Sequence, residues 1–146
     1  GLARALARRE KVRDILLRFQ RELFVVGAEL ATSPEHYERL SRRIEEKDTQ
    51  RLEHWMDQLE EEIDLPQAFV IPGALPSSAA LDLARTIIRR AERGVARLKD
   101  RTLMTNEEIV KYLNRLSDLL FTLARYEEGG EYDLFCLKDV NVMSEE

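Results

Sequence analysis

The sequence predicts an all-α protein, an up-and-down bundle of four to five helices. Apolar residues recur at three- and four-residue spacing through four long stretches of the chain. Charged residues make up 35% of the 146 residues and hydrophobic ones 44%, with few glycines and prolines, which is typical of long amphipathic helices. The breaks between the stretches are short, and short connections place consecutive helices side by side and antiparallel.

The first predicted helix spans residues 2–31. Its apolar residues step by four and three, as in the seam of a bundle helix: Val12, Leu16, Phe19, Leu23, Val26 and Leu30. Gly27 lies inside this helix, where glycine costs about 1 kcal/mol relative to alanine. We therefore expect another element to approach Gly27 closely. Thr32-Ser33-Pro34 ends the pattern.

Residues 35–47 are polar and weakly periodic, which predicts a connection with a turn or two of helix started by Ser33 and Pro34. A second helix is predicted from about Thr49 to Ile63. Its apolar face carries Leu52, Trp55, Met56, Leu59 and Ile63. Trp55 could stack on a ligand, but a core position is the more common role for a tryptophan at this spacing.

The third predicted helix follows an extended segment, Phe69-Val-Ile-Pro-Gly73, and begins at Ser77 or Ser78, where a hydroxyl can cap the first N–H groups. One arc of this helix suits core packing: Leu83, Ala84, Ile87, Ile88, Ala91, Val95 and Leu98. A neighbouring arc roughly 100° wide carries Arg85, Arg89, Glu92 and Arg93. Such a patch suits a polyphosphate, although a solvated face with i,i+4 ion pairs is the commoner explanation.

Thr105-Asn-Glu-Glu108 has the pattern of a capping box and predicts the start of a fourth helix. Its core face carries Ile109, Tyr112, Leu113, Leu116, Leu120 and Leu123. Asn114 lies in a largely apolar stripe, where its amide can bond a neighbouring helix or, less commonly, a ligand. Arg115 and Asp118 are spaced to pair on one helix face. Gly129-Gly130 ends this helix.

We expect residues 1–146 to form a single domain, with 131–146 as a partly ordered tail, because no repeat or second composition interrupts the chain. A net charge of −5 argues against a general nucleic-acid binder but leaves room for a local basic pocket. The single cysteine, Cys136, excludes an internal disulfide and favours a reducing compartment. No apolar run is long enough to span a membrane and no signal peptide is visible, so we predict a cytoplasmic protein.

The sequence contains no Ser-His-Asp or Cys-His arrangement that would suggest nucleophilic catalysis, and no Gly-x-x-x-x-Gly-Lys loop. His36 and His54 belong to no Glu-x-x-His pair, and no cysteine or carboxylate stands beside them at zinc-ligand spacing. We therefore expect no metal site formed by protein ligands alone. The residues by themselves predict a helical bundle with a patch for an anionic ligand on its third helix.

Three segments of the chain together resemble one known family. They are Phe69-Val-Ile-Pro-Gly73, Ala84-Arg-Thr-Ile-Ile-Arg-Arg-Ala-Glu-Arg93 and Leu113-Asn-Arg-Leu-Ser-Asp118. These segments are similar to the ATP:cob(I)alamin adenosyltransferases of the propanediol-utilisation type, the family that includes the human mitochondrial cobalamin adenosyltransferase. Gln20-x-x-Leu-Phe-x-x-Gly-x-x-Leu-Ala-Thr32 also resembles the family's first long helix, so the resemblance extends to about Tyr126.

The resemblance implies a trimer of helical bundles with active sites between subunits. It also implies a transferase that moves the 5′-deoxyadenosyl group of ATP to the cobalt of cob(I)alamin, releasing triphosphate and forming adenosylcobalamin. Mg²⁺ would accompany ATP, and cobalamin would be a substrate. A corrinoid reductase and a cobalamin-dependent acceptor enzyme are the implied protein partners, whereas neither nucleic acid nor a membrane is.

Carried over by position, the resemblance assigns ATP binding to Arg89, Arg90, Glu92, Arg93 and Asn114. Arg89 and Glu92 would act in catalysis, because arginines can neutralise the departing triphosphate and a glutamate can hold the metal or orient an arginine. Phe69 matches an aromatic residue beside the corrin, where an apolar ring helps displace the lower axial ligand. Arg85 matches an arginine that pairs with an aspartate across the subunit interface.

Some family features have no counterpart in these residues. The Thr-Lys-x-Gly-Asp-x-Gly-x-Thr phosphate loop and the Asp-Glu segment that pairs with Arg85 would both precede Gly1, which aligns with the interior of a family helix. We expect both in the full protein, and a chain that truly starts at Gly1 should bind ATP poorly. The family's Pro-Gly-Gly is Pro72-Gly73-Ala74 here, with Pro76 added, so this loop can take another course.

Two functions of other classes compete with this prediction. One is an ATP-binding regulatory or cofactor-delivery bundle that keeps the pocket without turnover. The other is a purely structural helical bundle, for which Arg89→Ala should leave every ligand property unchanged.

Overall fold

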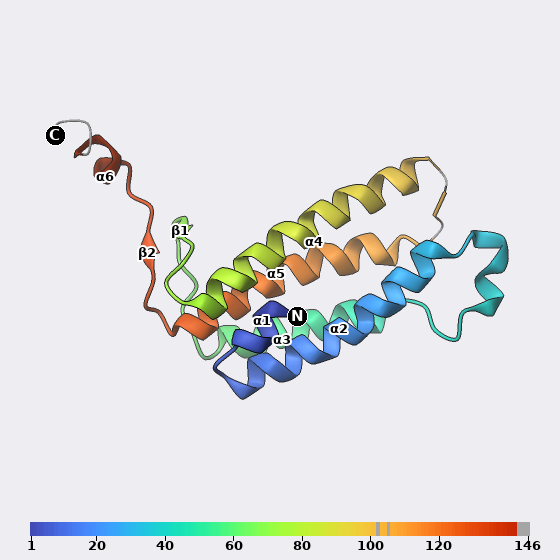
Figure 1. The fold of residues 1–146 in the computed structure, drawn as a ribbon, viewed down its shortest axis with the longest axis horizontal. Coiled ribbons are helices and arrows are strands. Elements are labelled where there is room, and N and C mark those ends of the chain that lie inside the picture. Colours follow the sequence, from blue (N-terminus) through green and yellow to red (C-terminus); the bar gives the residue numbers. More distant parts are fainter. Residues whose placement is uncertain (102, 105, 143–146) are drawn as a thin grey trace.

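The computed structural model describes residues 1–101, 103–104 and 106–142, with side chains described as far as Val140. Its elements follow the chain in this order: α1 (Leu2–Leu6), α2 (Glu10–Ala31), the 3-10 helix η1 (Pro34–Arg39), α3 (Glu46–Glu60), β1 (Val70–Ile71), α4 (Pro76–Asp100), α5 (Glu108–Glu128), β2 (Asp133–Leu134) and α6 (Leu137–Val142). The long helices α2, α3, α4 and α5 run up and down in turn (Figure 1). The predicted helical bundle is confirmed.

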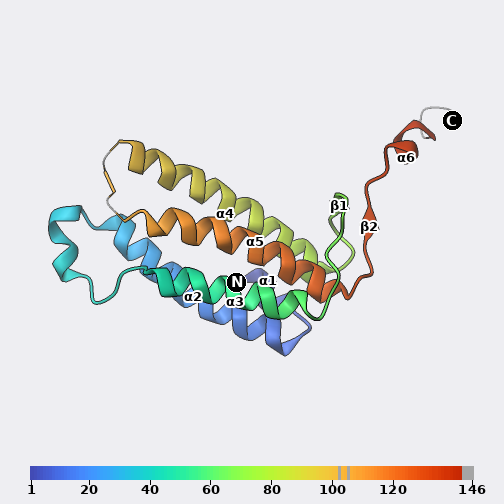
Figure 2. The same ribbon diagram turned by 180° about the vertical axis from the view of Figure 1, so that it is seen from behind.

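Helix α5 forms the centre of the bundle, and it packs against both α4 and α3. Its fully buried apolar side chains make up much of the core: Ile109, Tyr112, Leu116, Leu119, Leu120 and Leu123. The view from behind shows α3 and α4 on either side of α5 (Figure 2). Trp55, on α3, is partly buried and packs against this core, as its spacing predicts.

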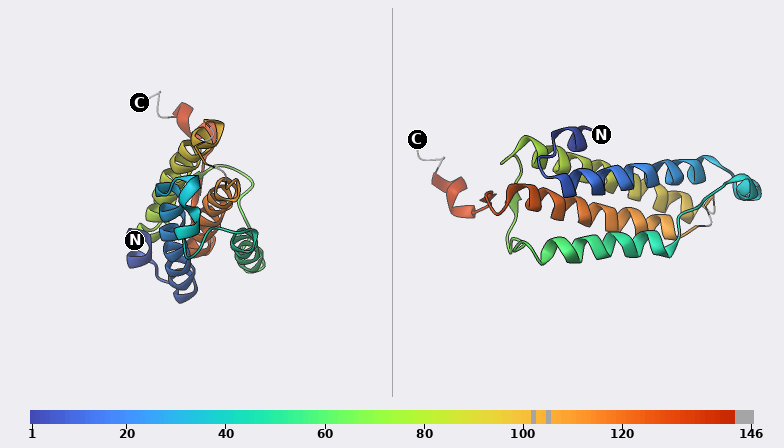
Figure 3. Two further views of the ribbon diagram at one scale, coloured as in Figure 1. Left: turned by 90° about the vertical axis from the view of Figure 1, so that its right-hand side faces the viewer. Right: turned by 90° about the horizontal axis from the view of Figure 1, so that it is seen from below.

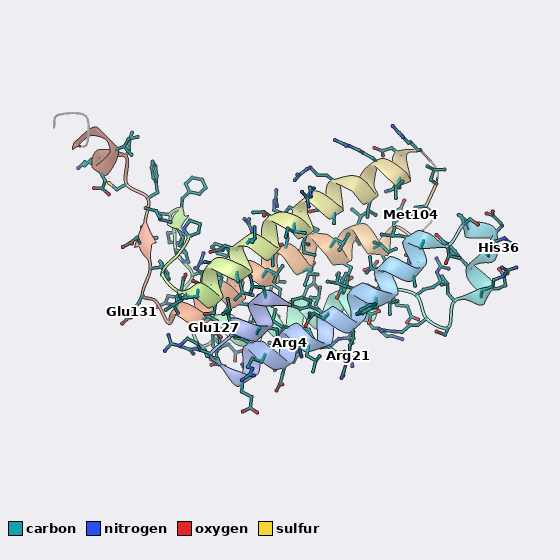
Figure 4. All side chains as sticks on the ribbon, in the orientation of Figure 1. Arg4, Arg21, His36, Met104, Glu127 and Glu131 are labelled. Atoms are coloured by element: carbon teal, nitrogen blue, oxygen red, sulfur yellow. The ribbon has the colours of Figure 1, made fainter. Side chains whose placement is uncertain are left out.

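The two ends of the bundle carry different features. The loop with β1, the strand β2 and α6 all lie beyond one end, whereas η1, the end of α4 and the start of α5 lie at the other (Figures 1 and 3). Glu127 and Glu131 mark the first end, and His36 and Met104 the second (Figure 4). Strands β1 and β2 pair antiparallel, Val70 with Leu134 and Ile71 with Asp133. This short ribbon is a departure from the predicted all-α class.

The predicted helix over residues 2–31 is wrong in one respect, because the chain breaks between α1 and α2. Ala7 and Arg9 are extended, with ψ near 130°. The carboxylate of Glu127 accepts hydrogen bonds from the backbone N–H groups of Arg8 and Arg9, at 3.0–3.2 Å. Glu127 is buried at the end of α5, and it satisfies the N–H group of Arg9, the N-cap of α2, and that of Arg8 before it.

Other helix starts also differ from the prediction. Helix α4 begins at Pro76, which occupies a favoured first position, and Ser78 lies a turn inside, where its Oγ accepts from the N–H of Leu75 at 3.2 Å. Helix α3 begins at Glu46 rather than Thr49, because Asp48 Oδ2 accepts from the N–H of Glu45 at 3.0 Å.

The predicted capping box at Thr105–Glu108 lies partly outside the described residues, since Thr105 is not among them. Helix α5 begins at Glu108, and Asn106 Oδ1 accepts from its N–H at 3.1 Å. The helix ends as predicted, at a left-handed Gly129 with φ 63°. The short helical turns predicted after Ser33 are confirmed by η1.

Two packing predictions fail within the single chain. Leu83 and Ile87 belong to the expected core arc of α4, yet they are 55% and 47% exposed. Gly27 is exposed, and nothing that the structure describes comes within 4 Å of the position a Cβ would take there. No part of the chain that the structure describes therefore covers the α4 surface at Leu83 and Ile87 or the α2 surface at Gly27.

A buried polar network joins the middle of α2 to the first turns of α3 and α5. Glu22 is 1% exposed, and its carboxylate accepts from Tyr112 Oη at 2.7 Å and from Arg51 Nη2 at 2.5 Å. Arg51 also bonds Asp48, whose side chain is fully buried. Burial and the neighbouring charge of Glu22 raise the pKa of Tyr112, so its phenol stays protonated and donates.

No helix within the described part of the chain is long and apolar enough to cross a membrane.

Candidate active site

Three adjoining clefts follow the outer face of α5. The first and third are lined by residues of both α3 and α4, whereas the second is lined by α3 and α5 alone. The first lies near the start of α5 and has a volume of about 350 Å³. The second, of about 450 Å³, shares Glu53 and Arg115 with the first. The third, of about 510 Å³, shares Met56, Glu60 and Asp118 with the second. Together they form one groove, which we call the α5 groove.

The first cleft brings together two residues that the sequence assigned to ATP. Asn114 Nδ2 donates a 2.9 Å hydrogen bond to Glu92 Oε1, across from α5 to α4. Both side chains line the cleft, together with Thr49, Glu53, Val110, Lys111 and Arg115. The structure confirms the neighbouring-helix bond predicted for Asn114. A ligand in the cleft would meet a carboxylate and an amide that already orient each other.

The arginines of α4 lie beside this cleft rather than in it. Arg89, Arg90 and Arg93 are exposed, and none forms a hydrogen bond or ion pair with another described residue. The i,i+4 ion pairs of the solvated-face interpretation are therefore not formed among the described residues. Arg90 stands two residues before Glu92, about 160° away around the helix, so it leaves α4 on a different side.

The second cleft links the other two through an ion-paired arginine. Arg115 Nε donates to Glu53 Oε1 at 3.0 Å, and Arg115 Nη1 to Asp118 Oδ2 at 3.4 Å. The predicted pairing of Arg115 with Asp118 is confirmed. Because Asp118 also lines the third cleft, this arginine connects the two ends of the α5 groove.

The third cleft holds Phe69 and Arg85. Phe69 comes just before β1 and is 83% exposed, an unusual environment for a large apolar ring. Leu65, Val70 and Phe121 add further apolar surface to the lining. The guanidinium carbon of Arg85 lies 5.7 Å from the centre of the Phe121 ring. Arg85 Nε is buried yet has no hydrogen-bond partner among the described residues, so its N–H is available to donate to one.

The C-terminal segment fixes the loop that presents Phe69. The N–H of Phe135 donates to the carbonyl oxygen of Phe69 at 2.7 Å, directly beside the β1–β2 pair. The sequence predicted only a partly ordered tail after Gly130. A two-residue strand is too short to show an alternating pattern, so nothing in the sequence could have revealed this contact.

Sequence reasoning also missed Phe121 and Arg125, which both line the third cleft. The sequence does contain a pattern that could have indicated these two residues. Ser117, Phe121 and Arg125 follow one another at four-residue steps on α5, and a charged residue on a mostly buried stripe calls for a partner.

Four of the site residues assigned from the sequence thus fall into two groups at opposite ends of one groove, whereas Arg89, Arg90 and Arg93 line none of its clefts. Glu92 and Asn114 meet in the first cleft, and Phe69 and Arg85 in the third. In the described part of the chain, no cluster of three or more histidine, cysteine or acidic side chains could hold a metal ion.

Comparison with known proteins identifies the family. The family model described as cobalamin adenosyltransferase matches residues 1–127. A corrinoid adenosyltransferase of Citrobacter freundii is 43% identical over 128 residues, covering 88% of this chain and 72% of the relative. One from Mycobacterium leprae (strain TN) is 40% identical over 136 residues, covering 89% and 71%.

Solved structures agree in fold as well as in sequence. A variant of the PduO-type ATP:corrinoid adenosyltransferase from Lactobacillus reuteri, complexed with cobalamin and ATP, superposes with a TM-score of 0.80 at 31% identity. The match covers 91% of this chain and 76% of that one. A second variant of the same enzyme, also complexed with cobalamin and ATP, gives a TM-score of 0.79 at 32% identity, covering 92% and 75%. The chain belongs to the cobalamin adenosyltransferase family, in its PduO-type group.

Proposed function

We propose that the α5 groove is where this protein, an ATP-dependent enzyme that transfers an adenosyl group to cobalamin, brings its two substrates together. The group transferred is the 5′-deoxyadenosyl group, and triphosphate leaves as adenosylcobalamin forms. The observation that carries the proposal is the Glu92–Asn114 hydrogen bond at one end of a groove whose other end holds Phe69.

ATP is proposed to bind at the first cleft. Asn114 and Glu92 offer a donor and an acceptor inside it, and Arg89 and Arg93 extend from the same helix without partners among the described residues. Unpaired guanidinium groups suit phosphate oxygens, which accept two parallel hydrogen bonds from one arginine. Arg90 leaves α4 on another side, so its proposed phosphate contact would be made with a nucleotide that lies between subunits.

Mg²⁺ is proposed to accompany the nucleotide. This cation is usually held by one or two carboxylates together with substrate phosphates, rather than by an all-protein cage. Glu92 and Glu53 both line the first cleft, and they provide such carboxylates. Bound there, the ion would neutralise charge on the phosphates. Glu92 would then act either as its ligand or by orienting an arginine.

The chain's main chemical contribution is proposed to be stabilisation of the leaving group. Negative charge builds up on the triphosphate as its bond to the ribose carbon breaks. Arg89 and Arg93 stand where they can bind that charge more strongly in the transition state than in bound ATP, and this difference accelerates the reaction. Alignment of the ribose carbon with cobalt is proposed to supply the remaining acceleration.

Cobalamin is proposed to bind at the third cleft, where Phe69, Phe121, Leu65 and Val70 offer apolar surface. Asn114 and Phe121 are seven residues apart on α5, a rise of about 10 Å. An extended nucleoside triphosphate can span that distance. Phe69 is proposed to help displace the lower axial ligand of cobalt, which makes the metal easier to reduce.

A homotrimer with sites between subunits is proposed to complete the groove. Leu83 and Ile87 form an exposed apolar strip on α4, which a neighbouring subunit would cover. The buried and unpaired Nε of Arg85 supports the proposed ion pair with an aspartate of a neighbouring chain. A corrinoid reductase and a cobalamin-dependent acceptor enzyme are the proposed protein partners. The exposed free thiol of Cys136 suits a reducing compartment such as the cytoplasm.

The test is turnover by the full-length protein with ATP, Mg²⁺ and chemically reduced cobalamin under anaerobic conditions. The visible absorbance should change as cob(I)alamin becomes adenosylcobalamin, and phosphorus NMR should detect triphosphate. ATP binding without conversion would instead favour the regulatory or cofactor-delivery function.

A further inference from the structure

Arg125 is a buried cation at the third cleft to which the proposed mechanism gives no role. Its side chain is 2% exposed, although it belongs to the cleft lining. Arg125 Nη2 donates to Asp82 Oδ2 on α4 at 2.8 Å. Arg125 Nε and Nη2 donate to the two carboxylate oxygens of Glu128, at 2.7 and 3.1 Å. Three hydrogen bonds to two carboxylates hold this guanidinium plane in one orientation.

The same guanidinium lies against aromatic rings of the cleft region. Its central carbon is 4.9 Å from the ring centre of Phe121 and 5.8 Å from that of Tyr132. Arg85 approaches Phe121 as well, at 5.7 Å. The two cations differ in how they are held, because Arg125 is locked by ion pairs whereas Arg85 forms none with a described residue. Phe121 therefore rests against one fixed cation.

We propose that Arg125 is a positioning residue for the corrinoid. By fixing the ring of Phe121, it sets the shape of the apolar wall that the corrin meets, and so it determines corrinoid affinity and cobalt coordination but not ATP affinity. This inference rests on the proposed use of the third cleft for cobalamin. Glu128 is not part of the cleft lining and acts through Arg125, whereas Asp82 lines the cleft and also holds the guanidinium.

The contacts at position 125 require an arginine, and no other cationic side chain could form them all. A lysine ammonium is a point charge, and it cannot bond two carboxylates in a plane while stacking on Phe121. Arg125→Lys would therefore keep the charge balance of the buried cluster but release the ring. Cation–π and aromatic contacts of this kind contribute about 0.5–1.5 kcal/mol, which corresponds to a two- to tenfold change in affinity.

The experiment compares the full-length wild type with Arg125→Lys and Glu128→Gln. Arg9→Lys is the matched control, because Arg9 stacks on Tyr126 at 4.4 Å near the same end of the bundle but outside the third cleft. For each protein, thermal unfolding, the KM values for ATP and cob(I)alamin, and the affinity for cob(II)alamin in the presence of ATP are measured. Electron paramagnetic resonance gives the four-coordinate fraction of bound cob(II)alamin.

We expect both cleft variants to raise the KM for cob(I)alamin about two- to tenfold and to lower the four-coordinate fraction, with an unchanged KM for ATP. Arg9→Lys should change neither. A purely structural role would lower the melting temperature while leaving the cob(I)alamin KM and the four-coordinate fraction unchanged, and that result would overturn the inference. If Arg125→Lys does not fold, the positioning role is tested with Glu128→Gln alone, because that variant leaves the Asp82–Arg125 ion pair intact.

Failure of the proposed function would look different. A wild type that binds ATP without adenosylating cobalamin would contradict the proposed function itself. The cob(II)alamin affinities would still test Arg125, since wild-type affinity in both cleft variants would overturn the positioning role whether or not turnover occurs.

Discussion

The side-chain amide of Asn114 donates a 2.9 Å hydrogen bond to the carboxylate of Glu92, so two residues separated by 22 positions meet across α4 and α5. The bond orients both side chains toward the first cleft before any ligand arrives. Glu92 Oε2 and the second amide proton of Asn114 take no part in this bond. The carboxylate oxygen can therefore bind a metal ion, and the amide proton can be donated to a nucleotide.

Replacing Asn114 with alanine should therefore weaken ATP binding without harming the corrinoid end of the groove. Asn114 is exposed, so the fold should tolerate the change. The lost bonds to charged groups are each worth about 1.5–3 kcal/mol, and we expect the KM for ATP to rise at least tenfold. Steady-state kinetics with each substrate varied in turn provide the measurement. An equal rise in the KM for cob(I)alamin would contradict the separation of the two clefts.

Phe69→Ala should produce the opposite pattern. The ring is 83% exposed at the third cleft, so its removal creates no core cavity and should leave the melting temperature nearly unchanged. We expect a selective fault at the cobalt step, with slow turnover and a reduced four-coordinate fraction of cob(II)alamin. ATP affinity, measured by calorimetry, should remain close to wild type. A parallel loss of ATP affinity would count against the role proposed for this ring.

Phe135→Pro tests whether the C-terminal segment fixes the Phe69 loop. Proline has no N–H, so the 2.7 Å bond from residue 135 to the carbonyl oxygen of Phe69 cannot form. We expect this variant to share the cobalt-step fault of Phe69→Ala. Phe135→Leu keeps both the N–H group and an apolar side chain, and it serves as the control. Identical kinetics for the two variants would show that the backbone bond is unimportant.

The stability of the bundle should depend on the ionisation of Asp48. Burial alone would raise the pKa of this carboxyl, but the backbone N–H of Glu45 and the guanidinium groups of Arg51 and Arg42 outweigh it, so the pKa lies below its usual value. A lowered folded-state pKa means that ionised Asp48 stabilises the fold above about pH 4, the unfolded-state value, and that this stabilisation fades as the pH falls below it.

Asp48→Asn gives the measurement for that prediction. Breaking a buried ion-paired group costs about 3–5 kcal/mol, which should appear as a lower urea midpoint at pH 7. The difference from wild type should shrink between about pH 4 and pH 2, where the wild-type carboxyl becomes protonated. Asp139→Asn, at an exposed position on α6, is the control. A difference that grows as the solution is acidified would contradict the assigned ionisation.

The helices of this fold could be predicted because their apolar spacing is regular over many turns. The groove could be predicted only in part. Asn114 stood out because a polar residue in a largely apolar stripe calls for a partner, and Glu92, from the charged arc of α4, proved to be that partner. The positions of Arg89 and Arg93 on α4 follow from helix geometry alone.

The remaining features depend on contacts between distant segments. The break before Glu10 arises because Glu127, at the far end of the bundle sequence, accepts the N–H groups of Arg8 and Arg9. Leu83 is exposed even though its spacing is that of a core residue, because helical periodicity does not say whether a neighbour in the same chain covers a face. The pairing of Val70 with Leu134 likewise involves too few residues to leave a pattern.

The measurement that tests the central claim most directly is the adenosylation assay on full-length Arg89→Ala. Arg89 is exposed on α4 with no partner among the described residues, so its removal should leave the unfolding transition unchanged while ATP binding or turnover falls by orders of magnitude. Arg97→Ala, two turns further along the exposed surface of the same helix, should behave as wild type. A folded Arg89→Ala enzyme that converts cob(I)alamin at the wild-type rate would contradict the account.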